Sequence, residues 1–285
     1  MDVKTITLAS GATVPALGQG TWYLGDDPAA RAREISALRT GVGAGMRLID
    51  TAEMYGGGRS EKLVGEAIAN TPREELFLVS KVLPENAGER HIFQCCDATM
   101  KRMGVDYLDL YLLHWRGSVP LAETVRCLEQ LKEMGKIKNW GVSNFDIDDM
   151  EELWRISQGR NCQVNQVLYH MGSRGIEYSL LPWMREHQVA LMAYCPLAQG
   201  GSLRRGLLNN SAVLAIAEKH HATPIQVLLA WCVRDGHTIA IPRTGHPDHT
   251  LENAGANALT LDEEDLARID RQYAPPTHKM YLDIQ

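Results

Sequence analysis

Short apolar runs alternate with longer mixed stretches along most of the chain, and this alternation predicts strands separated by helices. The runs LFLVSK (76–81) and VALMAYC (189–195) are apolar at nearly every position, not at every second one. Such runs are typical of parallel strands that are buried on both faces. The chain begins differently: two short strand-like runs, 3–8 and 13–17, flank a Ser-Gly pair and so predict a β-hairpin.

After the hairpin, the pattern predicts eight strands, at 17–22, 46–50, 76–81, 107–114, 137–144, 162–166, 189–195 and 237–242. It predicts helices at 28–44, 60–70, 89–103, 120–134, 146–158, 177–187, 211–220, 223–235, 248–257 and 262–273. We expect Ser60 to cap the second of these helices and Gly104 to end the third. The segment with Gly200 and Gly201 is expected to be a long loop, and residues 274–285 a short tail.

Eight strands that alternate with helices favour a parallel sheet with helical crossovers. The chain has 285 residues, close to the size of about 250 residues that a single (β/α)8 barrel typically needs. The even spacing favours this TIM barrel over an open doubly wound sheet, with the hairpin capping the barrel floor and extra helices at the C-terminal end. We therefore expect one α/β barrel domain over residues 1–285, although the length alone would also fit two domains.

Composition excludes several classes of function. A net charge of −6 gives no reason to expect a nucleic-acid groove. No stretch approaches the roughly 20 apolar residues of a membrane span, and the N-terminal segment lacks the apolar core of a secretory signal. None of the six cysteines is part of a C-x-x-C pair, which argues against a zinc or thioredoxin motif and favours reduced thiols. We expect a cytoplasmic protein.

Three consecutive predicted strands end on titratable side chains. Asp50 ends the second strand, Lys81 the third and His114 the fourth. Tyr55 stands in the loop after Asp50, directly before three glycines. In a closed parallel barrel the C-terminal ends of the strands form one rim, which is where active sites lie. We therefore expect these four side chains to converge.

These four residue types suit the reduction of a carbonyl group. Addition of a hydride leaves negative charge on the oxygen, and a nearby acid must supply a proton. A phenol with a pKa of about 10 is a poor donor near neutrality unless a cation such as Lys81 lowers that pKa. Asp50 would hold Lys81 charged, and neutral His114 would orient the substrate oxygen. Taken singly, each residue is better explained as a strand-end cap, a structural histidine, a turn residue or a loop aromatic. Taken together, at three consecutive strand ends and the loop between them, they favour a site.

Several segments resemble the aldo-keto reductase family, in the order that the family has them. They include VPALGQGTW, LIDTAEMYGGGRSEKLVGEAI, DYLDLYLLHW, GKIKNWGVSNF and IPRTGHPDHTLEN, and the resemblance covers nearly the whole chain. The segments QGTWYLGDD and LYHMGSRGIEYSLLPW are most similar to bacterial members of the methylglyoxal-reductase type. The resemblance implies a (β/α)8 barrel in which Asp50, Tyr55, Lys81 and His114 are catalytic, with Tyr55 as proton donor.

By the same resemblance the cofactor is NADP(H), bound without the glycine loop of a dinucleotide fold. The segment GQGTWY agrees with this, because it lacks the third glycine of G-x-G-x-x-G. Ser143, Asn144 and Gln166 would bind the nicotinamide carboxamide, since amides and a hydroxyl supply both donors and acceptors. Tyr194 would stack on the nicotinamide ring. The further cofactor contacts that the resemblance implies are Gly20, Thr21, Trp22, Asp50, Pro196 and Leu197.

The adenosine end is less typical of the family. Arg243 and Thr244 stand where members bind the 2′-phosphate, usually with a lysine first, and an arginine can serve a phosphate equally well. His249 stands where NADPH-selective members often carry an arginine, and a histidine is mostly neutral near pH 7. Glu252 and Asn253 match the pair that contacts adenine. We expect NADPH to be preferred, with NADH also used but less efficiently.

Trp22 and Trp115 stand just past two strand ends, and we expect them to wall a substrate pocket that has Tyr55 and His114 at its base. The tail after Ala274 is short, which suggests an open site for small aldehydes, ketones and 2-oxoaldehydes. The alternative is a nicotinamide-binding regulatory subunit, which would carry a partner-binding extension or insertion. No metal-ligand cluster or nucleophile elbow supports a barrel enzyme of other chemistry. We expect a monomer with a small carbonyl substrate and no nucleic-acid, membrane or metal partner.

Overall fold

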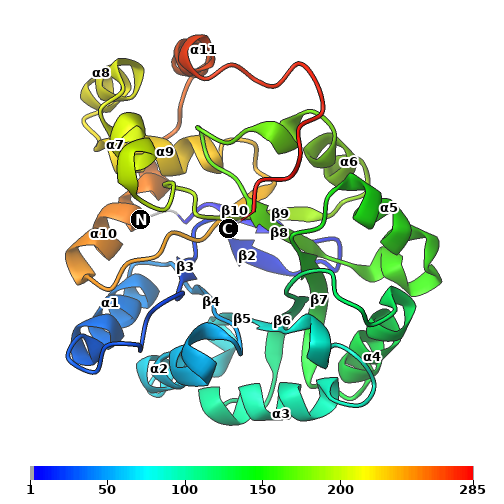
Figure 1. Ribbon diagram of the computed structural model, residues 1–285. Coiled ribbons are helices and arrows are strands. Elements are labelled where there is room, and N and C mark those ends of the chain that lie inside the picture. The colour runs from blue at the N-terminus through cyan, green and yellow to red at the C-terminus, as the bar shows by residue number, and fades with distance from the viewer. Residues whose placement is uncertain (1–2, 285) are drawn as a thin grey trace.

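The computed structural model describes residues 3–284. It begins with the predicted antiparallel hairpin of β1 (Thr5–Thr7) and β2 (Thr13–Pro15). At the hairpin turn, the backbone N–H of Ser10 donates to Gln163 Oε1 at 2.7 Å. Gln163 immediately precedes β8 (Val164–Leu168), so the hairpin covers the end of the barrel at which the strands begin. In Figure 1, β2 accordingly lies behind the ring of strands.

The remaining strands are β3 (Gln19–Gly20), β4 (Leu48–Asp50), β5 (Phe77–Val82), β6 (Leu108–Leu113), β7 (Ile137–Ser143), β8, β9 (Ala190–Tyr194) and β10 (Thr238–Ala240). Each pairs in parallel with its neighbours in the chain, in the order β3 to β10. The two edges also meet, because the N–H groups of Gly18 and Gly20 donate to the carbonyls of Ala240 and Pro242 at 2.9 and 3.1 Å. The sheet is a closed (β/α)8 barrel, as predicted, and not the open doubly wound sheet that was the alternative.

Helices surround the barrel (Figure 1). They are α1 (Arg31–Gly43), α2 (Arg59–Ile68), α3 (Ile92–Met103), α4 (Leu121–Glu133), α5 (Ile147–Arg155), α6 (Leu180–Glu186), α7 (Gly201–Leu208), α8 (Ser211–Lys219), α9 (Pro224–Cys232), α10 (Pro247–Gly255) and α11 (Glu263–Gln272). Short 3-10 helices are η1 (Tyr55–Gly58), η2 (Arg73–Glu75), η3 (Pro84–Asn86), η4 (Ser157–Asn161), η5 (Gly175–Glu177) and η6 (Ala256–Ala258). Within residues 3–284, none of the helices has the length and apolar character needed to cross a membrane.

Gly104 ends α3 as predicted, because it adopts the left-handed conformation, with φ of 68°, that favours glycine. Two local predictions are wrong. The expected loop after β9 contains α7, whose first residue is Gly201, and the two glycines there begin a helix instead of excluding one. Ser60 does not cap α2, because that helix begins one residue earlier and Gly58 occupies the cap position. The Ser60 hydroxyl is instead buried against Thr21.

The barrel interior beneath its C-terminal rim is closely packed and buried. All six residues of β5 and all six of β6 are buried, which agrees with their nearly continuous apolar sequences. Lys81, on β5, is among the largest side chains that are fully buried. A charged group in such surroundings is stable only when hydrogen bonds and opposite charges satisfy it.

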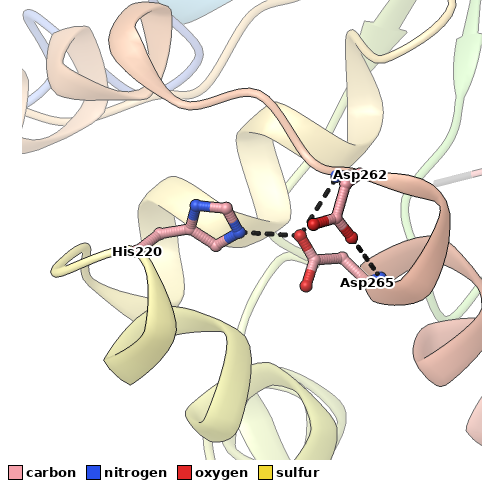
Figure 2. A group of neighbouring side chains, drawn as sticks. All are labelled: His220, Asp262 and Asp265. Atoms are coloured by element: carbon pink, nitrogen blue, oxygen red, sulfur yellow. Dashed lines mark hydrogen bonds and ion pairs between the residues drawn. The ribbon is translucent and has the colours of Figure 1, made fainter.

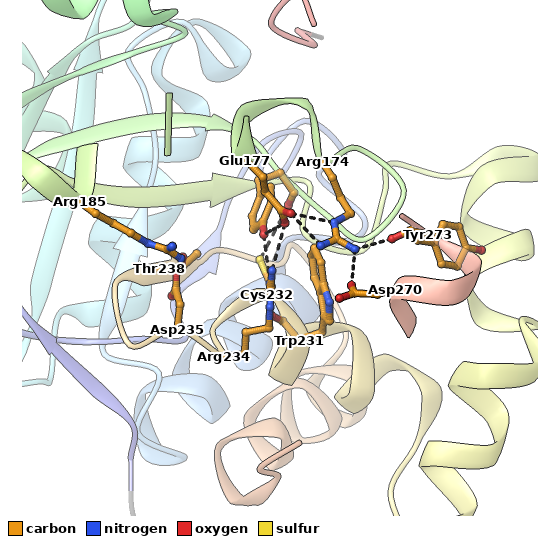
Figure 3. Close-up of polar contacts among 11 residues, drawn as sticks. Arg174, Glu177, Arg185, Trp231, Cys232, Arg234, Asp235, Thr238, Asp270 and Tyr273 are labelled. Carbon is orange, nitrogen blue, oxygen red and sulfur yellow. Dashed lines mark hydrogen bonds and ion pairs between the residues drawn. The ribbon is translucent and has the colours of Figure 1, made fainter. Parts of the chain in front are cut away.

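An ion-pair network fixes the loop after β8 to the last helices (Figure 3). Arg174 Nη2 lies 2.7 Å from Glu177 Oε2, and Arg174 Nη1 lies 2.7 Å from Asp270 Oδ1 on α11. Arg234, just after α9, pairs with Glu177 at 3.1 Å and lies over the Trp231 ring, 3.9 Å from its centroid. Because the side chains of Arg174 and Glu177 are only 7% and 12% exposed, loss of Arg174 would leave a largely buried carboxylate with one partner fewer.

The tail after α11 runs back toward the centre of the view in Figure 1. Lys279 Nζ lies 3.7 Å from Asp146 Oδ2 and 3.6 Å from Asp148 Oδ2, at the start of α5. The hydroxyl of Ser173 donates to the carboxylate of Asp283. The tail therefore ties together the loops that follow β7 and β8 at the C-terminal rim.

Candidate active site

The four predicted catalytic side chains meet at the C-terminal rim of the barrel. Asp50 is the last residue of β4, Lys81 lies one residue before the end of β5, and His114 directly follows β6. These strands are neighbours in the sheet. Tyr55 begins η1 in the loop after β4. The convergence follows from the parallel topology, because neighbouring parallel strands end at the same rim.

Lys81 is the hub of this group. Its ammonium donates to Asp50 Oδ2 at 2.8 Å, to the carbonyl of Thr51 at 2.9 Å and to the hydroxyl oxygen of Tyr55 at 3.2 Å. An ammonium has three donors, so these contacts satisfy it completely. Burial alone would lower the pKa of Lys81, but the Asp50 carboxylate and the Tyr55 oxygen outweigh burial and raise it. Lys81 is therefore a permanent cation beside the phenol.

The pKa of Tyr55 differs from the expectation that Lys81 would bring it down overall. Burial raises this pKa above its ordinary value of 10.0, Lys81 opposes the rise, and Asp50 adds to it. The lysine acts in the predicted direction, but the loss of water around the phenol is the larger effect. Tyr55 consequently keeps its proton at neutral pH.

His114 is neutral. Burial, assisted by the positive charge of Lys81, lowers the pKa of His114 to about 2. Its ring packs edge-on to that of Tyr55, with 5.8 Å between the ring centroids. The Nδ1 atom is buried and has no hydrogen-bond partner among the described residues. A neutral imidazole can donate from one ring nitrogen only, so it can offer a single hydrogen bond to a ligand oxygen.

Hydroxyl groups hold the loop that carries Tyr55. The Ser60 hydroxyl oxygen lies 2.8 Å from Thr21 Oγ1, and Thr21 Oγ1 donates to the Asp50 carbonyl at 2.9 Å. Thr51 Oγ1 donates to Ser60 Oγ at 3.2 Å. The loop between these anchors turns at three glycines with φ from 58° to 87°, a region that other residues rarely adopt. The glycines after Tyr55 thus allow the tight turn that returns the chain to α2.

A cleft of about 360 Å³ opens above these residues. This size lies within the range of small-molecule sites, roughly 300–1,000 Å³. Predicted site residues that line it are Gly20, Thr21, Trp22, Asp50, Tyr55, His114, Trp115, Ser143, Asn144, Gln166, Tyr194, Pro196, Leu197 and Arg243. Lys81 lies beneath the cleft and does not line it.

Three of the side chains predicted to contact the nicotinamide, Tyr194, Asn144 and Ser143, are linked by hydrogen bonds. Tyr194 Oη donates to Asn144 Oδ1 at 2.9 Å, and Asn144 Nδ2 donates to the His114 carbonyl at 3.2 Å. Ser143 Oγ donates to the Gln166 carbonyl at 2.8 Å. Asn144 has a φ of 58°, and asparagine tolerates this left-handed conformation better than most residues do. These hydrogen bonds hold the Tyr194 ring at the cleft wall.

The residues predicted for the adenosine end lie farther along the chain and only partly in the cleft. Arg243 lines the cleft, whereas Thr244, His249, Glu252 and Asn253 do not. The last three belong to α10, and Thr244 Oγ1 accepts a hydrogen bond from the backbone N–H of the residue that precedes this helix, at 3.1 Å. These four residues are therefore near Arg243 in sequence, but the cleft itself does not unite them.

Several cleft residues were not predicted, namely Tyr23, Met54, Cys195, Ala198, Gln199, Arg204, Ile241 and Pro242. Tyr23 stacks on Trp22 with 4.6 Å between the ring centroids, and it adopts a φ of 66°. Arg204 lies on α7, the helix that sequence analysis missed. The apolar Leu203 and Leu207, spaced by four residues, were the available signal for that helix.

A separate cluster of His220, Asp262 and Asp265 has its potential ligand atoms within 4.8 Å of one another (Figure 2). Lys219 Nζ, however, lies 2.6 Å from Asp262 Oδ2 and 2.8 Å from Asp265 Oδ1. The two aspartates also form the capping box at the start of α11. The ammonium and the helix cap account for this cluster as a structural link between α8 and α11.

Comparison with known proteins identifies a family. The model of the aldo/keto reductase family matches residues 16–274. Over 284 residues the chain is 49% identical to methylglyoxal reductase YeaE of Escherichia coli, with 100% of both chains covered. It is 34% identical over 268 residues to glyoxal reductase of Bacillus subtilis, covering 93% of this chain and 91% of that protein.

The fold comparison agrees. The crystal structure of an aldo/keto reductase from Klebsiella pneumoniae, in complex with NADP and acetate, superposes with a TM-score of 0.96. That protein is 48% identical in sequence, and the match covers 100% of both chains. The similarity therefore extends over the entire barrel, including the hairpin and the C-terminal helices.

Proposed function

The chain belongs to the aldo/keto reductase family, and we propose that it reduces small aldehydes, ketones and 2-oxoaldehydes of the methylglyoxal kind to alcohols with NADPH. The relatives named as methylglyoxal and glyoxal reductases, and the related structure that contains NADP, support this reaction class. The single observation that carries the assignment is the Tyr55 hydroxyl beside the buried Lys81 ammonium, at 3.2 Å.

The cleft suits a nicotinamide cofactor. A neutral, buried His114, the hydroxyl of Tyr55 and the amides of Asn144 and Gln166 all line it. Asn144 Oδ1 accepts one hydrogen bond, from Tyr194, and an amide oxygen has capacity for a second. Arg243 also lines the cleft, and its guanidinium suits a phosphate group. These groups match a ligand that carries both an aromatic amide and an anion.

Proton transfer falls to the residues of the chain. When bound, NADPH supplies the hydride that reduces the carbonyl carbon. Tyr55 gives its proton to the carbonyl oxygen, and Lys81 stabilises the phenolate that remains. Asp50 holds Lys81 in place through its 2.8 Å ion pair. His114 donates a hydrogen bond that orients the carbonyl oxygen toward Tyr55.

The substrate end of the cleft is aromatic. Trp22 lies 6.4 Å from Tyr55 between ring centroids, and Trp115 lies 4.7 Å from His114. Both indoles line the cleft, and Trp115 is exposed at its rim. An open, aromatic-walled mouth favours small carbonyl compounds without strict selection of the rest of the molecule.

NADPH is the preferred cofactor in this proposal, with Arg243, Thr244 and His249 near its 2′-phosphate and Glu252 with Asn253 near adenine. Arg243 provides a fixed charge and a fork of donors, whereas the imidazole of His249 has fewer donors to offer a phosphate. NADH therefore binds less tightly but is still used.

We also propose that the whole chain, residues 1–285, is one barrel domain that acts as a monomer in the cytoplasm. A regulatory subunit that binds nicotinamide without turnover is not favoured, because the similar proteins are reductases.

Initial rates of NADPH and NADH oxidation, measured across a panel of aldehydes, ketones and 2-oxoaldehydes, test the proposal. We expect turnover of 2-oxoaldehydes with NADPH, and weaker rates with NADH. Tight NADPH binding without turnover of any carbonyl in the panel would favour the regulatory alternative. Absence of both binding and turnover would contradict the proposed function.

A further inference from the structure

The side chain of Gln166 reaches across the barrel to Asp50. Gln166 lies on β8 and Asp50 on β4, on opposite sides of the barrel. Gln166 Nε2 donates to Asp50 Oδ1 at 2.7 Å, although the residues are 116 positions apart in the chain. Lys81 donates to the other oxygen, Oδ2, at 2.8 Å. The Asp50 carboxylate is thus held by one donor on each oxygen.

The hydrogen bond matters because the groups that make it are almost fully buried. Gln166 and Asp50 are each 2% exposed, and Lys81 is 0% exposed. A carboxylate buried this deeply is costly unless donors satisfy its oxygens. Because a carboxylate only accepts, the amide NH2 of Gln166 must face it, and Oε1 remains as the acceptor end of the amide.

We propose that Gln166 is a positioning residue for proton transfer, because its amide fixes the Asp50 carboxylate and thereby sets the electric field that Asp50 and Lys81 exert on Tyr55. This inference rests on the proposed function, in which the same amide also contacts the nicotinamide carboxamide. A single side chain then joins recognition of the cofactor to release of the proton.

The direction of the effect follows from the groups that face the Tyr55 hydroxyl. They are Lys81 on β5, the Asp50 carboxylate on β4, His114 after β6 and the Cys195 thiol after β9. Asp50 opposes ionisation of the phenol. Donation from Gln166 spreads the negative charge of Asp50, and removal of that donor concentrates the charge. The pKa of Tyr55 is therefore expected to rise when Gln166 loses its amide.

The test follows Tyr55 itself in the cofactor-free protein. Titration by NMR, with tyrosine labelled at Cζ and Tyr55→Phe used for assignment, reports the pKa of this phenol over the range in which circular dichroism shows the fold intact. In Gln166→Met the pKa should rise by about 0.5 unit or more, and in Gln166→Glu further, because a second carboxylate adds negative charge. An unchanged titration in both variants would overturn the proposal. Since no turnover is involved, this result is independent of whether the protein is a reductase.

Gln163→Met is the matched control. Gln163 is also a buried glutamine beside β8, but its amide donates to the Asn161 carbonyl at 2.7 Å at the barrel floor. We expect this variant to lose stability without any shift of the Tyr55 titration. If Gln166→Met behaved in the same way, its role would be structural only.

A second measurement distinguishes the positioning role from a role of Gln166 in cofactor binding alone. A cofactor-binding role alone predicts that substitution raises the Kd for NADPH and leaves the titration of Tyr55 unchanged, and that result would contradict the proposal. The positioning role predicts that the high-pH limb of the pH–kcat profile shifts to higher pH in Gln166→Met, even at saturating NADPH. Gln166→Glu supplies the same comparison should the methionine variant fail to fold.

Discussion

The ammonium of Lys81 lies 3.2 Å from the hydroxyl oxygen of Tyr55, and 4.8 Å from the centre of the Tyr55 ring. The cation does not ionise the phenol in advance, because burial keeps the pKa of Tyr55 raised. The pair therefore combines a proton that is ready to be donated with a positive charge at the place where negative charge would form. Stabilisation of developing charge by a preorganised group is usually a large part of catalysis.

Replacement of Tyr55 by phenylalanine removes the proton donor and leaves the ring. We expect kcat to fall by about 10²–10⁴-fold, whereas the Kd for NADPH stays the same, because the hydroxyl donates to the substrate. Steady-state rates and fluorescence titration with NADPH check both quantities. Tyr281→Phe is the control, since Tyr281 is 96% exposed and lies outside the cleft lining. Full activity in Tyr55→Phe would show that another group donates the proton.

The rate of reduction should be independent of pH across the range, about 5–8, in which an ordinary histidine titrates. The pKa of His114 is lowered by burial to about 2, so His114 charges only at far lower pH. The pKa of Tyr55 is raised, so the donor loses its proton only as the pH rises above the ordinary phenol value. A pH profile of kcat at saturating NADPH checks this. A limb near pH 6.5 would mean that His114 is charged in the working enzyme.

The convergence of the four candidate side chains could be predicted from the sequence because the signal is local. Asp50, Lys81 and His114 each end an apolar run, and parallel topology converts three such ends into one rim. The hydrogen bond from Gln166 to Asp50 could not be predicted, since it depends on which side chains face each other across a closed barrel. The net direction of the pKa shift of Tyr55 could not be predicted either. Burial raises this pKa and the Lys81 charge lowers it, and the sequence does not show how deeply the phenol is buried.

The two local errors have different causes. A glycine pair usually interrupts a helix, so Gly200 and Gly201 predicted a loop, yet α7 begins at Gly201. Serine before an apolar run usually caps a helix, yet Ser60 is used inside the first turn of α2 to bind Thr21. At Ser60 a tertiary contact decides the outcome, and the short-range sequence pattern does not contain it. For α7 the spacing of Leu203 and Leu207 was available, but the glycine pair was given more weight.

Substitution of His249 by arginine should sharpen the choice of cofactor. A guanidinium, whose fixed charge and fork of donors suit a phosphate, replaces an imidazole, so the ratio of the Kd for NADH to that for NADPH should increase about 3–10-fold. Isothermal titration with both cofactors measures the ratio. His246→Arg is the control. The His246 ring lies 5.2 Å from that of His249 between ring centroids, so this substitution adds the same charge nearby. An equal effect of both substitutions would indicate attraction at long range instead of a contact at position 249.

Arg174→Met should lower the stability of the fold. The substitution leaves Asp270 without this ion pair and leaves Glu177 with Arg234 as its remaining cation. We expect the free energy of unfolding to fall by about 2–4 kcal/mol, as measured by urea denaturation. Arg155→Met is the control, since its side chain is 78% exposed and its pair with Glu151 spans 4.0 Å. A comparable loss in both variants would show that the network does not stabilise the loop after β8.

Closure of the barrel joins distant parts of the chain, since Gly20 pairs with Arg243 where the first and last strands meet. Both residues also line the cleft. During synthesis on a ribosome, one edge of β3 therefore stays unpaired until more than two hundred further residues have been translated. Unpaired strand edges are prone to aggregate. Nascent chains of this protein should thus depend on chaperones until the last strand emerges.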